Sequence, residues 1–148
     1  MLRDKYNLQR FIKAQDLTFS IALKELQEGK KCSHWMWYIF PQLKHLGHSY
    51  NAKFYGISGL EEAAAYLEVP VLTLRLRKVS ETILNLSTNN PIEVFGGIDS
   101  LKLCSSMTLF DIILPNDIFA HVLDKYFNGQ RDNCTIKIIK QSNNETYI

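Results

Sequence analysis

The segment Ser33–Gln42, with the sequence SHWMWYIFPQ, concentrates side chains that can do chemistry. His34 is the best single candidate for a catalytic group, because a histidine side chain gains and loses a proton near neutral pH. Trp35 and Trp37 are candidates for binding a flat ligand, and Gln42 is a candidate for orienting a substrate or a water molecule. On a helix, His34 and Trp37 would lie three residues apart and share a face.

Three interpretations of this aromatic segment stay open. Its rings can belong to a central helix buried in the core, form the wall of a ligand pocket, or make an exposed patch that contacts another protein. His34 likewise has structural alternatives, since a histidine can cap a helix or donate a hydrogen bond to a buried carbonyl.

A second candidate stretch is residues 99–110, with the sequence DSLKLCSSMTLF. Lys102, Ser105 and Ser106 are spaced so that the cation and a hydroxyl can face one side of a helix. No G-x-S-x-G pattern surrounds either serine, so hydrogen bonding to a ligand or a neighbouring helix is favoured over a nucleophilic role. Arg75 is a third candidate, because its planar guanidinium suits a carboxylate or a phosphate; a solvated helix face is the alternative.

Composition excludes several classes of function. The net charge of +2 is too small for a typical nucleic-acid-binding surface. No apolar run reaches the roughly 18 residues of a membrane span, and no signal-peptide pattern is present. Three widely spaced cysteines, and two histidines three residues apart without a third ligand, indicate neither disulfides nor a metal site. We expect a cytoplasmic monomer or weak homo-oligomer that uses no cofactor and has no nucleic-acid or membrane partner.

Apolar residues recur at spacings of three and four along nearly the whole chain, which predicts an all-α fold. We expect a compact irregular bundle of about seven to nine mostly short helices in a single domain over residues 1–148. The core should cover about residues 7–139. Residues 132–140 fit a last helix better than an edge strand, and residues 141–148 should form a flexible tail.

Local signals predict where individual helices begin. Asp16 can cap a helix that follows a shorter one, and Ser58 with Glu61 matches a capping box. Pro70 suits the first turn of a long amphipathic helix, since its missing N–H would be unpaired there. Asp99 can cap the helix that carries Lys102.

Longer strings in the sequence resemble a known family. They are SHWMWYIFPQL at 33–43, YGI at 55–57, PVL-x-x-RLR at 70–77 and KL-x-SSMTLF at 102–110. Together they are similar to the family catalogued as domain of unknown function 1810, over about residues 7–139. The resemblance implies a small single-domain all-α fold without an established biochemical activity, and it adds Tyr55 and Thr108 to the candidate residues. The chain departs from the family pattern at Val69, where histidine is frequent, and at Cys104, where a polar or basic residue is usual.

These observations predict a pocket between the Trp35–Gln42 segment and the Lys102–Thr108 helix. We expect it to bind a small ligand, anionic or nucleotide-like, and to support metal-independent hydrolysis or group transfer with His34 handling the proton. The alternative is a protein-interaction or regulatory module without catalysis. The candidate ligand-binding residues are Trp35, Trp37, Gln42, Tyr55, Arg75, Lys102, Ser105, Ser106 and Thr108.

Overall fold

The computed structural model describes residues 4–146, and this part of the chain is helical, which confirms the predicted all-α class. Within it the structure contains no strand, and a single isolated bridge joins Leu43 to Ile57. The helices are α1 (Gln9–Gln27), α2 (Met36–Ile39), the 3-10 helix η1 (Lys44–Leu46), α3 (Tyr50–Phe54), α4 (Leu60–Glu68), α5 (Pro70–Leu84), α6 (Pro91–Ile113), α7 (Ile118–Phe127) and α8 (Asn133–Thr146).

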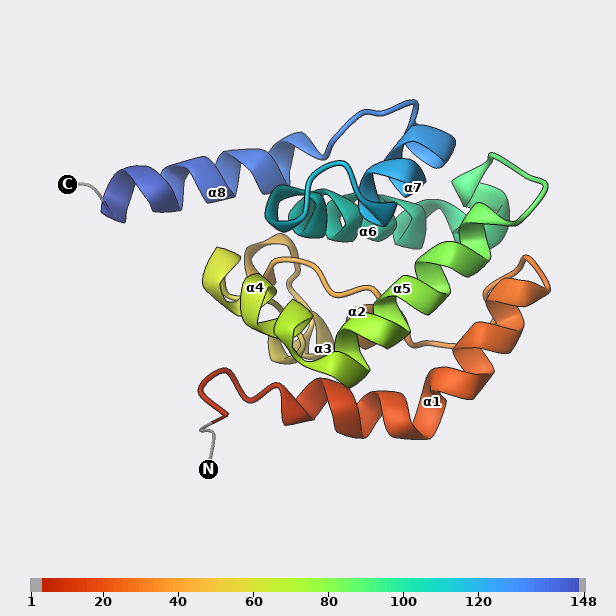
Figure 1. Ribbon diagram of the computed structural model, residues 1–148, viewed down its shortest axis with the longest axis horizontal. Coiled ribbons are helices and arrows are strands. Elements are labelled where there is room, and N and C mark those ends of the chain that lie inside the picture. Colours follow the sequence, from red (N-terminus) through yellow and green to blue (C-terminus); the bar gives the residue numbers. More distant parts are fainter. Residues whose placement is uncertain (1–3, 147–148) are drawn as a thin grey trace.

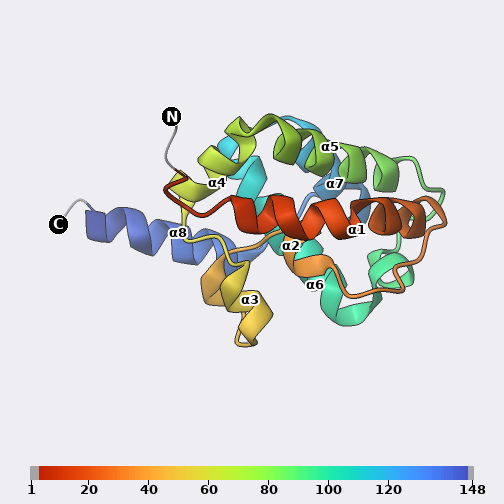
Figure 2. The ribbon, with the colours of Figure 1, turned by 90° about the horizontal axis from the view of Figure 1, so that it is seen from below.

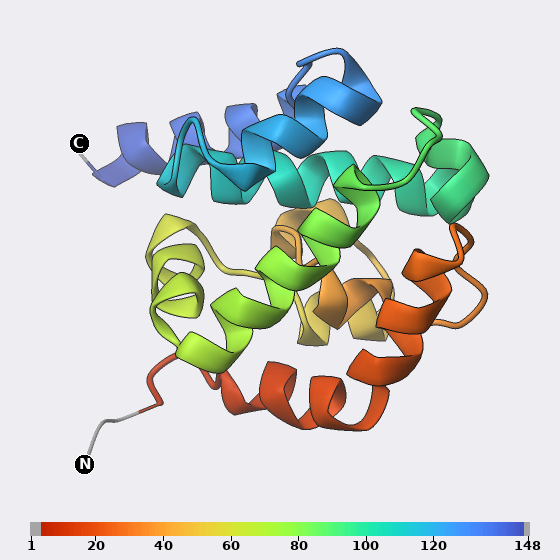
Figure 3. The ribbon, with the colours of Figure 1, turned by 45° about the vertical axis from the view of Figure 1, so that its right-hand side comes forward.

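The helices enclose the aromatic segment in the middle of the molecule. Helices α6, α7 and α8 form one side and α1 forms the opposite side, while α5 runs between them and contacts both α1 and α7 (Figure 1). The short helix α2 lies inside this frame against α1 and α5, as the view from below (Figure 2) and the obliquely turned view (Figure 3) show. The segment that begins at Trp35 is therefore held on several sides, and Trp35 itself is fully buried.

Helix α5 follows its sequence pattern closely. Pro70 occupies its first position, as predicted, where the missing N–H costs nothing. Its apolar stripe, formed by Leu72, Leu76, Val79 and Ile83, is at most 1% exposed. Each such side chain contributes about 1.5–3 kcal/mol on transfer from water to the interior, so this stripe fixes the central helix.

The predicted helix start at Asp16 is wrong. Helix α1 runs without a break from Gln9 to Gln27, and Asp16 lies in its middle, where it binds Arg75 of α5 at 2.7 Å. The helix is capped further upstream, because the Asp4 carboxylate accepts hydrogen bonds from the N–H groups of Leu8 at 2.7 Å and Gln9 at 3.1 Å. A carboxylate can thus mark either a cap or an interhelical ion pair, and local sequence does not separate the two.

The capping box predicted at Ser58 and Glu61 does not form. Helix α4 begins after Gly59, and the backbone N–H of Ser58 donates to Glu62 at 2.9 Å instead. Asp99 does not cap a helix either. It lies inside α6, just past a kink at Gly96, whose φ of 81° is a conformation that favours glycine.

The last predicted element is a helix, as favoured over an edge strand. Asp132 precedes α8, and its Oδ2 accepts from the Thr135 N–H at 2.9 Å and the Thr135 hydroxyl at 2.6 Å. Part of the stretch predicted as a flexible tail, residues 141–146, continues α8. Residues 147–148 lie outside the described part of the chain.

Candidate functional site

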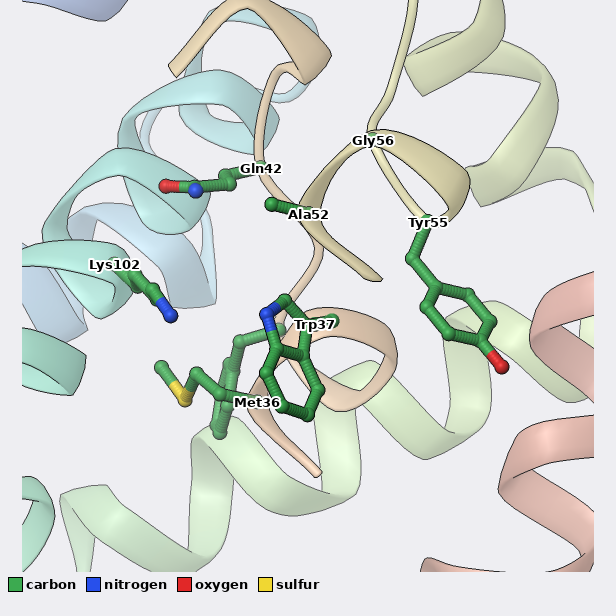
Figure 4. Close-up of a pocket in the computed structure, with 8 residues that line it drawn as sticks. Met36, Trp37, Gln42, Ala52, Tyr55, Gly56 and Lys102 are labelled. Carbon is green, nitrogen blue, oxygen red and sulfur yellow. The ribbon is translucent and has the colours of Figure 1, made fainter. Parts of the chain in front are cut away.

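A small hollow opens where α2, α3 and α6 meet (Figure 4). Its volume is about 10 Å³, close to what one water molecule needs. We call it the Trp37 hollow, and its lining residues are Met36, Trp37, Phe40, Gln42, Ala52, Tyr55, Gly56 and Lys102. The fold thus brings together four of the residues predicted from the sequence, namely Trp37, Gln42, Tyr55 and Lys102.

The Trp37 hollow adjoins a wider depression, which we call the outer groove. Its volume is about 380 Å³, and it shares Gln42, Ala52 and Lys102 with the hollow. The other lining residues are Leu46, Gly47, His48, Ser49, Ile98, Leu101 and Ser105. A ligand with one end in the hollow therefore has room for a larger body outside it.

Backbone contacts fix the strand-like segment that carries Gln42. The Gln42 carbonyl accepts from the N–H of Ile57 at 2.9 Å, and the N–H of Lys44 donates to the Ile57 carbonyl at 2.8 Å. Gly56 makes this pairing possible, because a Cβ there would lie 2.4 Å from the Lys44 Cα and 2.7 Å from the Ala52 carbonyl oxygen. The turn around Gly56 thus holds Gln42 beside α3 at the edge of the hollow.

Hydrogen-bond donors converge on the Trp37 hollow. The Lys102 ammonium lies 5.4 Å from the centre of the Trp37 ring, and Figure 4 shows the Trp37 indole nitrogen on the side that faces it. Gln42 extends its carboxamide toward α6 in the same view. Among the described residues, neither the indole N–H nor this carboxamide has a hydrogen-bond partner. The hollow therefore presents a positive charge and uncommitted donors.

An acidic residue balances part of this charge. Asp99 Oδ1 lies 3.6 Å from the Lys102 ammonium, while Asp99 Oδ2 lies 2.9 Å from the ammonium of Lys31. The carboxylate is thus shared by two lysines, with the shorter contact to Lys31. The trio carries a net charge of +1, which favours anions at the hollow.

Trp35 is held as a structural residue by Glu25. The Glu25 carboxylate accepts from the Trp35 indole N–H at 3.0 Å, from the Ser33 hydroxyl at 2.6 Å and from the backbone N–H groups of Cys32 and Ser33 at 2.7 and 2.9 Å. Burial raises the pKa of Glu25, but the hydrogen bonds from Ser33, Cys32 and Trp35 outweigh it and lower the pKa to about 2. Trp35 therefore does not line the hollow.

His34 does not line the hollow either. It is exposed, and it precedes α2, which begins only at Met36. The helical spacing that would place His34 and Trp37 on one face therefore does not apply. No described contact links His34 to the lining residues, and the imidazole that lines the outer groove is that of His48.

Tyr55 lines the hollow with its ring only. Figure 4 shows its hydroxyl pointing away from Lys102 and Gln42. The ring packs against Phe11, Tyr38 and Phe54 at centroid distances of 6.1, 5.1 and 4.8 Å. Burial raises the pKa of Tyr55, with the neighbouring tyrosines adding to the effect. Tyr55 therefore acts as an apolar wall.

The remaining candidates from α6 hold α8 or the core. Thr108 accepts a hydrogen bond from the N–H of Asp132 at 2.9 Å. Ser105 donates to the Leu101 carbonyl at 3.1 Å and lies 3.3 Å from Asp132, although it also reaches the rim of the outer groove. Ser106 is fully buried, and its hydroxyl has no partner among the described residues.

Arg75 is committed elsewhere. Its guanidinium binds Asp16 at 2.7 Å and Gln15 at 3.4 Å, both on α1, and stacks over Phe19. The structure thus places it in the contact between α1 and α5, and it does not reach the hollow.

Sequence reasoning missed the ion pair that anchors α3 and its following turn. Arg10 and Glu62 are 7% and 4% exposed and meet at 2.7 Å. The same guanidinium donates to the carbonyls of Phe54 at 2.7 Å and Gly56 at 3.0 Å. No local signal marks this pair, since its members are 52 residues apart. The pairing of Asp99 with Lys102 could have been detected from the sequence, because the two residues lie three apart on one helix.

Comparison with known proteins places the chain in a family and finds a similar solved structure. A family model described as "Protein of unknown function (DUF1810)" matches residues 5–139. The chain belongs to this family. A solved structure, that of the conserved hypothetical protein Rv1873 from Mycobacterium tuberculosis, is similar to this DUF1810 chain with a TM-score of 0.90 and 42% identity over 93% of this chain and 99% of that one. No curated protein shows significant similarity.

Two further properties concern the whole described part of this DUF1810 protein. No described helix combines the length and the apolar character that crossing a membrane requires. Residues 4–146 hold no group of three or more His, Cys, Asp or Glu side chains placed to bind a metal ion.

Proposed function

We propose that the Trp37 hollow binds the anionic group of a small molecule. The observation that carries this proposal is the convergence of the Lys102 ammonium, the Trp37 indole N–H and the Gln42 carboxamide on one hollow. These groups are partly exposed, and an anion would take the place of water on them with charge-assisted hydrogen bonds.

Lys102 is the group that supplies the charge. Its contact with Asp99 is 3.6 Å long, whereas Lys31 holds the other oxygen of that carboxylate at 2.9 Å. Because Lys31 continues to compensate Asp99, Lys102 can turn to a ligand without leaving a carboxylate unpaired. The arrangement favours a ligand with one or two exposed negative oxygens, and a nucleotide-like ligand stays within this class as a prediction.

Catalysis is a separate proposal that requires a proton carrier. The outer groove contributes the imidazole of His48. Metal-independent hydrolysis or group transfer at this site would therefore use His48 in place of His34, with Gln42 orienting the substrate or a water molecule.

The binding proposal is tested by titrating the protein with inorganic phosphate and with acetate at constant ionic strength. Lys102→Met keeps an unbranched side chain that is one atom shorter and removes the charge, so anion binding should weaken by at least about tenfold. Lys13→Met is the matched control, because it removes the same charge from an exposed position on α1. Equal affinities of the two variants would contradict the proposal.

A protein-interaction module remains the second candidate, and one observation favours it. Large apolar side chains are exposed outside the groove, namely Leu17 (83%), Ile21 (50%) and Leu74 (66%) on α1 and α5. If these residues form a contact surface, the mass of the protein in sedimentation equilibrium should rise with concentration or with an added partner, and Leu74→Ser should suppress the rise. A mass that stays monomeric, alone and with added partners, would oppose this candidate.

A further inference from the structure

The outer groove has an apolar wall that the proposed anion site does not explain. Ile98 and Leu101 are 74% and 69% exposed, although both line the groove. They lie three residues apart on α6, so they are neighbours on one face of the helix. Leu46 adds a third apolar side chain from η1. An apolar wall inside a concave surface is a feature of sites that bury part of a ligand.

The same groove is free of acidic lining residues. None of its ten lining residues is Asp or Glu. The segment 29–60, which supplies α2, η1 and α3, contains four lysines, three histidines and no acidic residue. Two carboxylates contact the lining from outside it. Asp99 is shared by Lys31 and Lys102. Asp132 Oδ2 lies 3.3 Å from the Ser105 hydroxyl, while it also accepts from Thr135. The lining itself carries the positive charge of Lys102 and no negative charge, which selects against cations and against ligands with a positive body.

We infer that the site takes an amphipathic organic anion, with its anionic head at the Trp37 hollow and an apolar body against Ile98 and Leu101. This inference rests on the proposed function. The hollow, at about 10 Å³, admits only the oxygens of the head. The outer groove, at about 380 Å³, has the size of a small-molecule site and receives the rest. Lys102 stands at the junction, since it lines both spaces.

The head can be a phosphate or a carboxylate, because both present negative oxygens to the same donors. Two matched pairs of probes separate these sources: inorganic phosphate with phenyl phosphate, and acetate with phenylacetate. Within each pair, the second probe adds an aromatic body to the same head. Calorimetric titration of the full chain gives the dissociation constant for each probe.

For whichever head binds, the aromatic body should tighten binding about tenfold, equivalent to about 1.4 kcal/mol. In the double variant Ile98→Ser, Leu101→Ser this gain should fall below about threefold, while the affinity for the bare head stays unchanged. Ile92→Ser is the matched control, because Ile92 is 58% exposed on the same helix, α6, and lines neither the hollow nor the groove, and it should keep the tenfold gain. Circular dichroism of each variant checks that the exposed substitutions leave the fold intact.

The outcomes show whether the apolar body fails alone or together with the proposed anion site. If a bare head binds but its aromatic partner binds no tighter, the apolar body is refuted and the anion site stands. If the gain persists in the double variant, the body lies elsewhere and the inference fails. If none of the four probes binds, the inference and the proposed anion site fail together.

Discussion

Replacing Glu25 by glutamine should destabilise the protein in a pH-dependent manner. The carboxylate accepts hydrogen bonds from two backbone N–H groups, the Ser33 hydroxyl and the Trp35 indole. Its pKa is lowered from 4.5 to about 2, which corresponds to about 3.4 kcal/mol at 1.36 kcal/mol per unit. Because the carboxylate keeps some contact with water, screening reduces the expected loss in Glu25→Gln to about 1.5–2 kcal/mol at pH 7.

The sign of the pH dependence follows from the lowered pKa. The folded state binds the proton less tightly than the unfolded chain, so the stabilisation is complete above a pH of about 4.5 and disappears as the pH falls toward about 2. At pH 3.5 the difference between wild type and Glu25→Gln should be smaller by roughly 40%. Urea denaturation followed by tryptophan fluorescence at pH 7 and pH 3.5 measures both quantities.

The control for this experiment is Glu81→Gln, on the exposed face of α5. It should change the free energy of unfolding by less than about 0.5 kcal/mol at either pH. Two results would refute the reasoning: a Glu25→Gln variant as stable as this control at pH 7, or a loss that grows as the pH falls. Either would mean that Glu25 does not hold the segment that carries Trp35.

Three other substitutions test the framework of the site by urea denaturation. Arg10→Met should cost about 3–5 kcal/mol, because it leaves the buried Glu62 uncompensated; a loss below 1 kcal/mol would contradict a buried pair. Gly56→Ala should cost at least about 2 kcal/mol, since its Cβ would lie 2.4 Å from the backbone of η1, and a neutral effect would be inconsistent with that approach. Thr108→Val should cost about 1 kcal/mol and speed amide exchange at Asp132; unchanged exchange there would argue against this contact.

The fold was largely predictable because its signals are local. The apolar stripe of α5 and the first-turn position of Pro70 depend only on residues within a few turns. Helix starts were less predictable where an acidic residue had a distant partner. Asp16 reads as a cap, but Arg75, 59 residues away, binds it in the middle of α1.

The site was predictable in part for the same reason. The two stretches that carry Trp37, Gln42 and Lys102 do meet, as their side chains suggested. Within each stretch, however, the direction of a side chain depends on tertiary partners. Trp35 turns to Glu25 and Thr108 to Asp132, and neither partner could be found from spacing alone.

The most direct test of the anion site is the indole N–H signal of Trp37 in a proton–nitrogen correlation spectrum. The protein has two tryptophans, and a Trp37→Phe variant assigns their signals. On titration with phosphate or acetate at constant ionic strength, the Trp37 signal should shift and saturate. The Trp35 signal should stay in place, because its N–H is bound to Glu25. If the Trp37 signal stays fixed with both anions, or if the two signals shift equally, the anion site at the Trp37 hollow is contradicted.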